Sequence, residues 1–334
     1  MRFAPSNEHT AFAASLGELL GGSDVPAIAR AWAEGDHGPG LALWHRLAEL
    51  GVTALLVPEG EGGLGADAVD LAIAFEVLGY HAVPGPLVES AAVVPVLLAG
   101  SAAGQRWLPR LAAGESLATV AVHPHVPHAV DADVAALRLS ITGDEVRACT
   151  GAGTGPLRSV DPARRLFALP PGELLPIGCG AAFDLGVLAV SSQLIGAAQR
   201  VLDDSVAHAA RRTQYGREIG RFQAVKHLLA DVAVAVELAR PLVRGAAVAL
   251  AGGAPEAARD VSAARVAAAD AAHLAVRTGL QVHGAVGYTR EHDLGLWLTK
   301  VRALIGVWGT GSFHRRRVRE ALTGAADGSG GGRA

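Results

Sequence analysis

The chain has 334 residues, of which 50% are hydrophobic and 18% charged, and its formal net charge at pH 7 is −3. This length favours two or more domains with a sizeable core, and the composition excludes an intrinsically disordered protein. The balanced charge supplies no basic surface for nucleic acid or anionic lipid, so neither is expected as a partner.

Residues 1–118 are predicted to form an N-terminal domain of helices joined by short loops. Apolar residues recur at three- and four-residue spacing over residues 41–50, 66–79 and 105–113, which predicts three helices. Between the first two of these, residues 52–57 have the composition of a strand.

The pattern changes in residues 119–180, where prolines and glycines separate short β-prone runs. The predicted strands cover residues 118–122, 134–141, 145–149 and 165–169. Their short length and close spacing predict a small β domain.

Helical patterns return in residues 181–322. Leu188 and Ile195 share one face of a first long helix, and an apolar stripe over residues 222–246 predicts a second. A third helix is expected to end at Gly284, because glycine is common just beyond helix C-termini.

The fourth helix is predicted to start near Asp293 and to carry Trp308 in phase with Leu298 and Ile305. Long apolar helices joined by short links favour antiparallel packing, which predicts a four-helix bundle. Residues 323–334 (TGAADGSGGGRA) are predicted to be a flexible tail. The predicted fold class is therefore mainly α with a small β domain.

Cysteine usage and the N-terminus indicate a cytoplasmic protein. The two cysteines, Cys149 and Cys179, have no paired spacing, which excludes a disulfide scaffold and favours a reducing compartment. The N-terminus lacks the continuous apolar segment of a signal peptide. No stretch approaches the ~18 uninterrupted apolar residues that a membrane span requires, so no membrane association is expected.

The segment GEGGLG at residues 60–65 matches the G-x-G-x-x-G pattern of dinucleotide-binding turns. Against that reading, Pro58 stands in the turn, and Glu59 and Glu61 would repel a pyrophosphate. No second parallel strand follows, as a dinucleotide fold requires. We therefore favour an ordinary turn over a nucleotide site.

Three histidines, His123, His125 and His128, lie close together in the sequence VHPHVPH. Three imidazoles could bind a metal, but prolines interleave them and no carboxylate or thiolate completes a ligand set. A solvated loop is the favoured interpretation, and no metal site is predicted.

Residues 212–223 (RTQYGREIGRFQ) combine a guanidinium, an aromatic ring and an amide at a junction between two helices. Arginine suits a pyrophosphate because it donates hydrogen bonds in a fork, and the Gln223 amide can pair with ribose or adenine edges. A charged turn between helices explains the same residues equally well. Composition leaves both interpretations open.

This segment resembles the R-x-x-F-G-x-x-I-x-x-F-Q signature of acyl-CoA dehydrogenases, with Tyr215 in place of Phe. Residues 281–288 (QVHGAVGY) resemble the second signature of that family, Q-x-x-G-G-x-G-F/Y, with Ala285 at one glycine. Residues 51–65 and 107–119 resemble two further blocks of the family. The resemblance thus covers nearly the whole chain.

The resemblance implies an N-terminal helical domain, a middle β domain and a C-terminal four-helix bundle, with FAD shared at a subunit interface. In the family, the Arg and Gln of the two signatures reach the FAD of a neighbouring subunit. The cofactor-binding candidates by match are Arg212, Tyr215, Gln223, Gln281, Gly284 and Gly287.

The family reaction requires a carboxylate that removes the α-proton of an acyl-CoA while the flavin takes the β-hydride. At the commonest position of this base, before Gly309 and Thr310, the chain has Trp308. At a second position, on the helix before the first signature, it has Gly186, and at a third it has Gln193. None of the three is a carboxylate, so no catalytic residue is predicted.

The β domain is expected to be short. The family's E-P-x-x-G-S-D-like loop and W-I-T-N-like strand, which bond the flavin ring, have no counterpart in residues 119–180. By this comparison roughly half of the usual β domain is missing. The chain is therefore expected to contribute to a neighbour's FAD without holding its own.

The resemblance extends in particular to short actinobacterial members that serve steroid and branched-acid catabolism, some of which are α2β2 heterotetramers with one degenerate subunit. It implies a second, catalytic acyl-CoA dehydrogenase subunit as partner, an acyl-CoA substrate, and electron-transfer flavoprotein as a candidate electron acceptor.

Two alternatives remain open. One is a self-sufficient homo-oligomer with an unrecognised base, for which Asp184, Glu291 and Asp293 are the nearby acids. Asp184 and Glu291 match family acids that are not the base, which favours structural roles for both. The other alternative is a repurposed scaffold for flavin oxygenation or for non-redox binding of an acyl chain.

Overall fold

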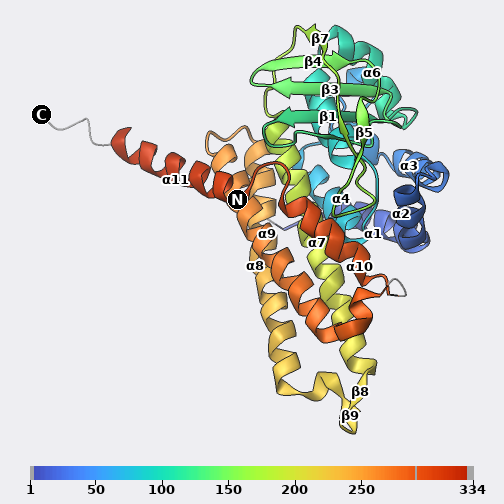
Figure 1. The fold of residues 1–334 in the computed structure, drawn as a ribbon. Helices are drawn as coiled ribbons and strands as arrows, with labels where there is room; N and C mark the ends of the chain where they lie inside the picture. The colour runs from blue at the N-terminus through green and yellow to red at the C-terminus, as the bar shows by residue number, and fades with distance from the viewer. Residues whose placement is uncertain (1–3, 290–291, 329–334) are drawn as a thin grey trace, which may run out of the picture.

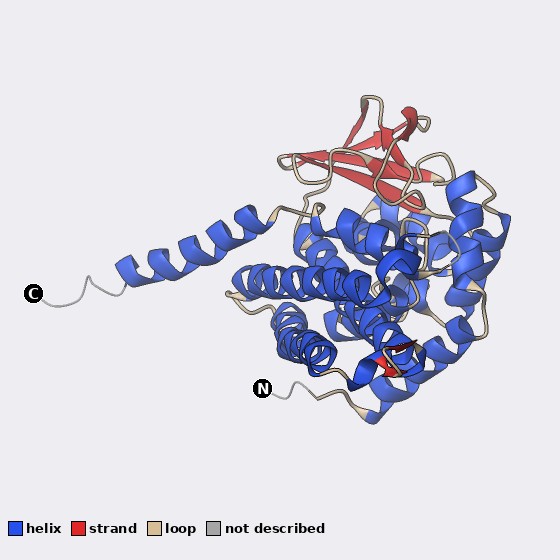
Figure 2. Ribbon diagram, turned by 60° about the horizontal axis from the view of Figure 1, so that its bottom comes forward, coloured by secondary structure: helices blue, strands red, loops and turns tan. Residues whose placement is uncertain are grey.

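The computed structural model describes residues 4–289 and 292–328. A helical N-terminal part and a small β part lie at one end of a bundle of long helices (Figure 1). Figure 2 shows most of the strands gathered on one side of the molecule, with one short hairpin apart from them among the helices. The predicted fold class, mainly α with a small β domain, is confirmed.

The three helices predicted in the N-terminal part are present, but the strand predicted at residues 52–57 is wrong. The helices are α1 (Asn7–Gly21), α2 (Val25–Glu34), α3 (Gly38–Glu49), α4 (Ala68–Tyr80), α5 (Val94–Leu98) and α6 (Ala102–Ala112), with the π-helical turn η3 (Val88–Val93) and the 3-10 turns η1 (Val52–Ala54) and η2 (Glu59–Glu61). Val52 and Val57 are fully buried by the surrounding helices. A short apolar run cannot distinguish such burial from a place in a sheet.

The β part contains the four predicted strands and three that were not predicted. Strands β1 (Ala118–His123), β3 (Leu137–Thr142), β4 (Glu145–Cys149) and β7 (Gly172–Leu175) form one sheet in the order β1-β3-β4-β7; β2 (Ala129–Val130), β6 (Leu166–Ala168) and β5 (Thr154–Leu157) form another. The missed strands β2, β5 and β7 have two to four residues each. Such short strands carry too little alternation to be recognised by pattern.

The bundle comprises α7 (Ala182–Arg211), α8 (Gln223–Ala251), α9 (Ala257–His283) and α10 (Leu294–Ile305). A hairpin of β8 (Thr213–Gln214) and β9 (Arg217–Glu218), followed by η4 (Ile219–Arg221), joins α7 to α8, and η5 (Gly284–Tyr288) follows α9. As predicted, Gly284 ends α9, with φ +62°.

Two predictions about the C-terminal region are wrong. Helix α10 ends at Ile305, so Trp308 does not continue its apolar face but lies in the turn before α11 (Gly311–Gly328). Helix α11 continues through residues 323–328, which were assigned to the flexible tail, and projects from the body of the molecule (Figure 2). Residues 329–334 lie outside the described part of the chain.

Helix α7 is the central element of the core. It packs against α4, α8 and α9. By length and composition α7 could cross a membrane, but 89% of its most apolar 18-residue window is buried inside the protein. Its apolar character is therefore explained by its place in the core.

Helices α4 and α7 cross with their backbones in contact. A Cβ atom at Gly196 would lie 1.8 Å from the carbonyl oxygen of Glu76, and one at Gly79 would lie 2.1 Å from the carbonyl oxygen of Gln193. Both distances are far below van der Waals contact, so only glycine allows this close approach.

The crossing predicts opposite effects for two helical Gly→Ala substitutions. Gly196→Ala should lower the free energy of unfolding by about 1–3 kcal/mol, because its methyl group overpacks the contact with α4. At Gly17, in α1, an added Cβ atom meets no atom within 4 Å. Gly17→Ala should therefore raise the free energy of unfolding by about 0.4–1 kcal/mol. Urea denaturation of both variants measures the difference, and equal stabilities would show that the helices do not cross this closely.

Candidate functional site

The turn that carries Trp308 is anchored by two buried side chains. The guanidinium of Arg265 donates to the carbonyl oxygens of Leu304, Ile305 and Val307 at 2.8, 3.1 and 3.1 Å. Leu304 and Ile305 belong to the last turn of α10, where carbonyls lack the usual helical donor four residues on, and Val307 follows the helix. The ring Nε2 of His314 lies 2.8 Å from the Trp308 carbonyl oxygen, and burial lowers the pKa of His314 to about 4. The neutral ring therefore donates this hydrogen bond.

Trp308 fills the space above Gly186, so two of the three candidate base positions are in direct contact. The indole is 0% exposed, and a Cβ atom at Gly186 would lie 2.5 Å from its Cζ3 atom. The ring of Phe183 lies beside it, with centroids 5.8 Å apart. Glycine at position 186 is thus what makes room for the indole.

Neither this pair nor Gln193 can act as a base. The indole has a donor and no acceptor, and its Nε1 has no hydrogen-bond partner among the described residues. Gln193, two turns along α7 from Gly186, is buried and neutral. The structure therefore places hydrophobic or neutral groups at every position where the family resemblance expects a carboxylate.

A cavity of about 250 Å³ lies beside Trp308, where the β part meets α7 and α11. Its lining includes His123, His125, Cys179, Phe183, Trp308 and Phe313. His125 packs between Phe313 and Phe183, with ring centroids 4.2 and 5.3 Å apart. Its burial lowers the pKa of His125.

The three clustered histidines of the sequence do not converge on a metal position in the described chain. His123 is exposed, whereas His125 is taken up in the aromatic cluster of Phe183 and Phe313. The segment is therefore only in part the solvated loop that was predicted, because His123 ends β1 and His125 packs against aromatic rings.

The described acids proposed as alternative bases are both in ion pairs. Asp184 forms a bidentate pair with Arg317, in which Oδ2 lies 3.0 Å from Nη2. Asp293 pairs with Arg30. Glu291 lies outside the described residues. Both carboxylates are engaged by guanidinium groups, and neither lines the cavity beside Trp308, so neither described acid is positioned as the base.

The cofactor-binding candidates gather at the opposite end of the bundle. Arg212 follows the last turn of α7, Gln223 begins α8 and Gln281 lies near the end of α9. Antiparallel packing places these three helix ends at the lower end of the bundle in Figure 1, where the β8–β9 hairpin between α7 and α8 forms the tip. Tyr215, in this hairpin, has φ +53° and is 92% exposed.

Only two of the candidates share one cavity. Gln281 and Gly284 line an open groove of about 660 Å³, together with Leu228, Leu274 and Arg277. Arg212, Tyr215 and Gln223 are exposed but do not line this groove. The Gln223 amide nitrogen lies 3.2 Å from Nε2 of His227, and Gly287 is buried against His283 and Leu294.

The base positions and the cofactor-binding candidates are far apart within one chain. Gly186 and Arg212 are separated by 26 residues along α7, which corresponds to about 39 Å of helix. Trp308 lies at one end of the bundle and the cofactor candidates at the other. The base positions and the cofactor candidates of one chain are therefore too far apart to belong to one reacting centre.

Residues 6–115 match the acyl-CoA dehydrogenase N-terminal domain, and residues 180–323 match the acyl-CoA dehydrogenase C-terminal domain. The chain is 34% identical over 300 residues to acyl-CoA dehydrogenase IpdE2 of Mycobacterium tuberculosis, which covers 89% of this chain and 91% of that protein. The chain belongs to the acyl-CoA dehydrogenase family. The resemblance inferred from the signatures is thus confirmed, and with it membership of a family of flavoprotein oxidoreductases.

Solved acyl-CoA dehydrogenase structures share the fold. The ChsE4–ChsE5 complex from Mycobacterium tuberculosis matches with a TM-score of 0.78 and 21% identity, covering 97% of this chain and 99% of the other. A glutaryl-CoA dehydrogenase from Mycobacterium smegmatis in complex with FADH2 matches with a TM-score of 0.80 and 17% identity, covering 96% and 95%. At these identities the likeness establishes the fold of this acyl-CoA dehydrogenase family member.

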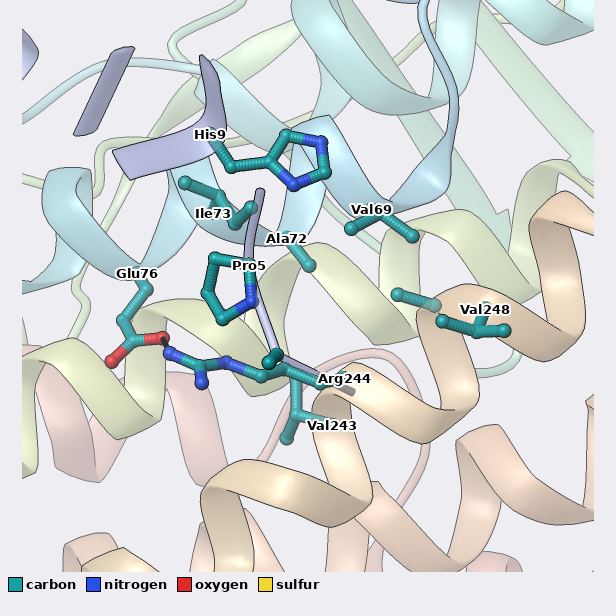
Figure 3. A pocket seen from close by; sticks show the side chains of 11 residues that line it. Pro5, His9, Val69, Ala72, Ile73, Glu76, Val243, Arg244 and Val248 are labelled. Atoms are coloured by element: carbon teal, nitrogen blue, oxygen red, sulfur yellow. Dashed lines mark ion pairs between the residues drawn. The ribbon is translucent and has the colours of Figure 1, made fainter. Parts of the chain in front are cut away.

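A third cavity, of about 150 Å³, lies between α1, α4 and α8 (Figure 3). Pro5, His9 and Ile73 line it on one side, and Glu76 and Arg244 approach to 4.0 Å at its edge. None of the base or cofactor positions lines it. We assign it no part in the family's chemistry.

Sequence patterns did not reveal one cluster of potential functional residues. His208, His283 and His292 come from α7, α9 and the segment before α10, yet their ligand atoms lie within 4.8 Å of one another. The spacing of these residues in the chain follows no metal-binding motif. Only the packing of the helix ends brings them together.

Proposed function

We propose that this chain is the non-catalytic subunit of a heteromeric, FAD-dependent acyl-CoA dehydrogenase that introduces an α,β double bond into an acyl-CoA thioester. The observation that carries the proposal is the contact of Trp308 with Gly186. The Trp308 indole stands at one position of the family's base and fills the space at the other, Gly186, and an indole cannot accept a proton. The partner subunit supplies the base.

The described residues fit a shared FAD. Arg212 is exposed at the bundle end, where its guanidinium can donate a fork of hydrogen bonds to a pyrophosphate. Gly284 is exposed, and a Cβ there would meet no atom within 4 Å, so its backbone is open to a ligand along the groove of Gln281. FAD, when bound, supplies the hydride acceptor, while these residues position its polar groups.

An exposed apolar stripe on α8 supports a subunit contact next to the groove. Val234, Leu238 and Leu242 follow one another at four-residue spacing and are 57%, 68% and 49% exposed. Leu228 and Leu274 continue apolar surface into the groove itself. Contiguous exposed apolar surface is a common mark of protein interfaces. A partner subunit docked on α8 would cover the stripe and close the groove over FAD.

The resemblance to short members of steroid and branched-acid catabolism suggests a bulky acyl-CoA as substrate and an α2β2 assembly. Electron-transfer flavoprotein is the proposed electron acceptor. The free thiols of Cys149 and Cys179 support a reducing, cytoplasmic compartment. The ion pairs of Asp184 and Asp293 count against a self-sufficient homo-oligomer.

The cofactor role of the first signature is tested by substitution in the co-expressed complex. Arg212→Ala should weaken FAD binding by about 1.5–3 kcal/mol, because it removes a hydrogen bond between charged groups. Gln223→Ala should weaken FAD binding less, because the Gln223 amide is neutral. Equilibrium release of FAD, followed by flavin fluorescence, measures both.

Arg211→Ala is a matched control, since it removes the same charge next to Arg212. In the unaltered chain, Nε of Arg211 donates to the Ala207 carbonyl oxygen at 3.2 Å. The Arg211→Ala complex should therefore retain FAD almost as well as the unaltered complex. If neither Arg212→Ala nor Gln223→Ala lowers FAD affinity more than this control does, the assignment of these residues is wrong.

A further inference from the structure

The ends of α7 and α9 and the segment before α10 bring His208, His283 and His292 together. The rings of His208 and His283 have centroids 4.3 Å apart, and those of His283 and His292 are 4.8 Å apart. Each residue can offer one ring nitrogen, and these nitrogens lie within 4.8 Å of one another. Three converging imidazoles are a ligand set typical of zinc and related ions.

His283 is held in the orientation that a metal ligand requires. Its Nδ1 lies 2.8 Å from the Gly279 carbonyl oxygen, so Nδ1 carries the proton and donates it. Its Nε2 is therefore a lone-pair acceptor directed into the cluster. A backbone carbonyl on the second ring nitrogen is the usual support of a metal-bound histidine.

The Nε2 atom of His283 is a buried acceptor without a hydrogen-bond partner among the described residues. The residue is 5% exposed. Buried polar groups are nearly always paired, and leaving one unpaired is costly. Coordination of a cation would satisfy this atom.

His292 needs a local rearrangement to take part. Its Nδ1 accepts the backbone N–H of Leu294 at 3.2 Å, which places the ring proton on Nε2. To coordinate through Nε2, the ring must give up this bond and change tautomer. Zn–N distances of about 2.0–2.1 Å in a tetrahedral site also require the three nitrogens to draw closer. His208 and His292 are half-buried, so both rings have room to turn.

We propose that His208, His283 and His292 form a binding site for one late first-row divalent cation of the Zn²⁺ type. His208 and His283 are the primary ligands, and His292 completes the set. The ion would tie together the ends of α7 and α9 and the start of α10, beside the groove lined by Gln281 and Gly284. Three protein ligands leave a fourth coordination position for water.

Titration of the tag-free, chelator-treated full chain with Co²⁺ tests the proposal. A tetrahedral Co²⁺ site should give intense visible ligand-field absorption that saturates at about one ion per chain and disappears when Zn²⁺ displaces it. His283→Ala and His208→Ala should each weaken Co²⁺ binding at least tenfold. His273→Ala, an exposed histidine of α9 outside the cluster, is the matched control and should bind as the unaltered chain does.

Circular dichroism verifies that each variant is folded. Should His283→Ala fail to fold, the half-buried His208→Ala still decides the question. The proposal is overturned if the unaltered chain gives no saturable Co²⁺ spectrum, or if His208→Ala binds Co²⁺ as tightly as His273→Ala. Metal binding by the isolated chain and FAD retention by the complex are measured separately, so either proposal can fail while the other stands.

Discussion

Purified alone, the chain is expected to contain far less than one FAD per molecule, whereas the complex with its catalytic partner should contain about one FAD per αβ pair. Arg212, Tyr215 and Gln223 lie exposed at one end of the bundle, and Gln281 and Gly284 line an open groove. An open half-site contacts only part of a ligand and cannot exclude water, so its affinity is low until a second subunit covers it. The ratio of flavin absorbance to protein concentration measures the loading.

The control for this prediction is the same complex carrying Arg212→Ala, which should assemble but lose FAD on dilution. A fully loaded yellow homo-oligomer of this chain, active on an acyl-CoA, would overturn the proposed function. It would show that the chain holds its own flavin and possesses a base that lies outside the positions of Trp308, Gly186 and Gln193.

Truncation of Trp308 should have the largest effect on stability. Trp308→Ala is expected to lower the free energy of unfolding by about 3–5 kcal/mol, the range for removing a large aromatic side chain from a core. The indole is fully buried against Gly186 and Phe183. Urea denaturation followed by circular dichroism gives the value.

A double-mutant cycle isolates the contact between Trp308 and Gly186. Gly186→Ala should cost about 1–3 kcal/mol in the unaltered chain, because its methyl group would overlap the indole. The same substitution should cost much less in a Trp308→Leu background, where the smaller side chain leaves room. Equal costs in the two backgrounds would show that the residues do not pack against each other as described.

Trp308→Glu should not convert the isolated chain into an acyl-CoA dehydrogenase. A carboxylate at this position still lacks a hydride acceptor when no flavin is bound, and its burial among apolar groups would also destabilise the fold. Dehydrogenation by the isolated variant would mean that the chain holds its own flavin. If Trp308→Ala instead abolished activity of the complex with assembly and FAD content intact, Trp308 would contact the substrate.

The order of helical, β and helical regions could be predicted because it depends on local signals. Apolar spacing identified α3, α4 and α6, and Gly284 marked the end of α9. The same signals failed where burial and periodicity do not coincide. Residues 52–57 are mostly apolar and are buried by neighbouring helices, not by a place in a sheet. Trp308 follows the apolar spacing of α10, although that helix ends at Ile305.

The family could be identified from the amino-acid sequence alone, because the signatures around Arg212 and Gln281 are contiguous segments with characteristic spacing. It also identified Trp308, Gly186 and Gln193 as residues without a carboxylate. The contact of Trp308 with Gly186 and the ion pair of Asp184 with Arg317 are visible only in the folded chain. The same holds for the convergence of His208, His283 and His292. The physical reason is that these contacts join residues far apart in the chain. They depend on how the helices pack against one another and where their ends meet, which no local pattern encodes.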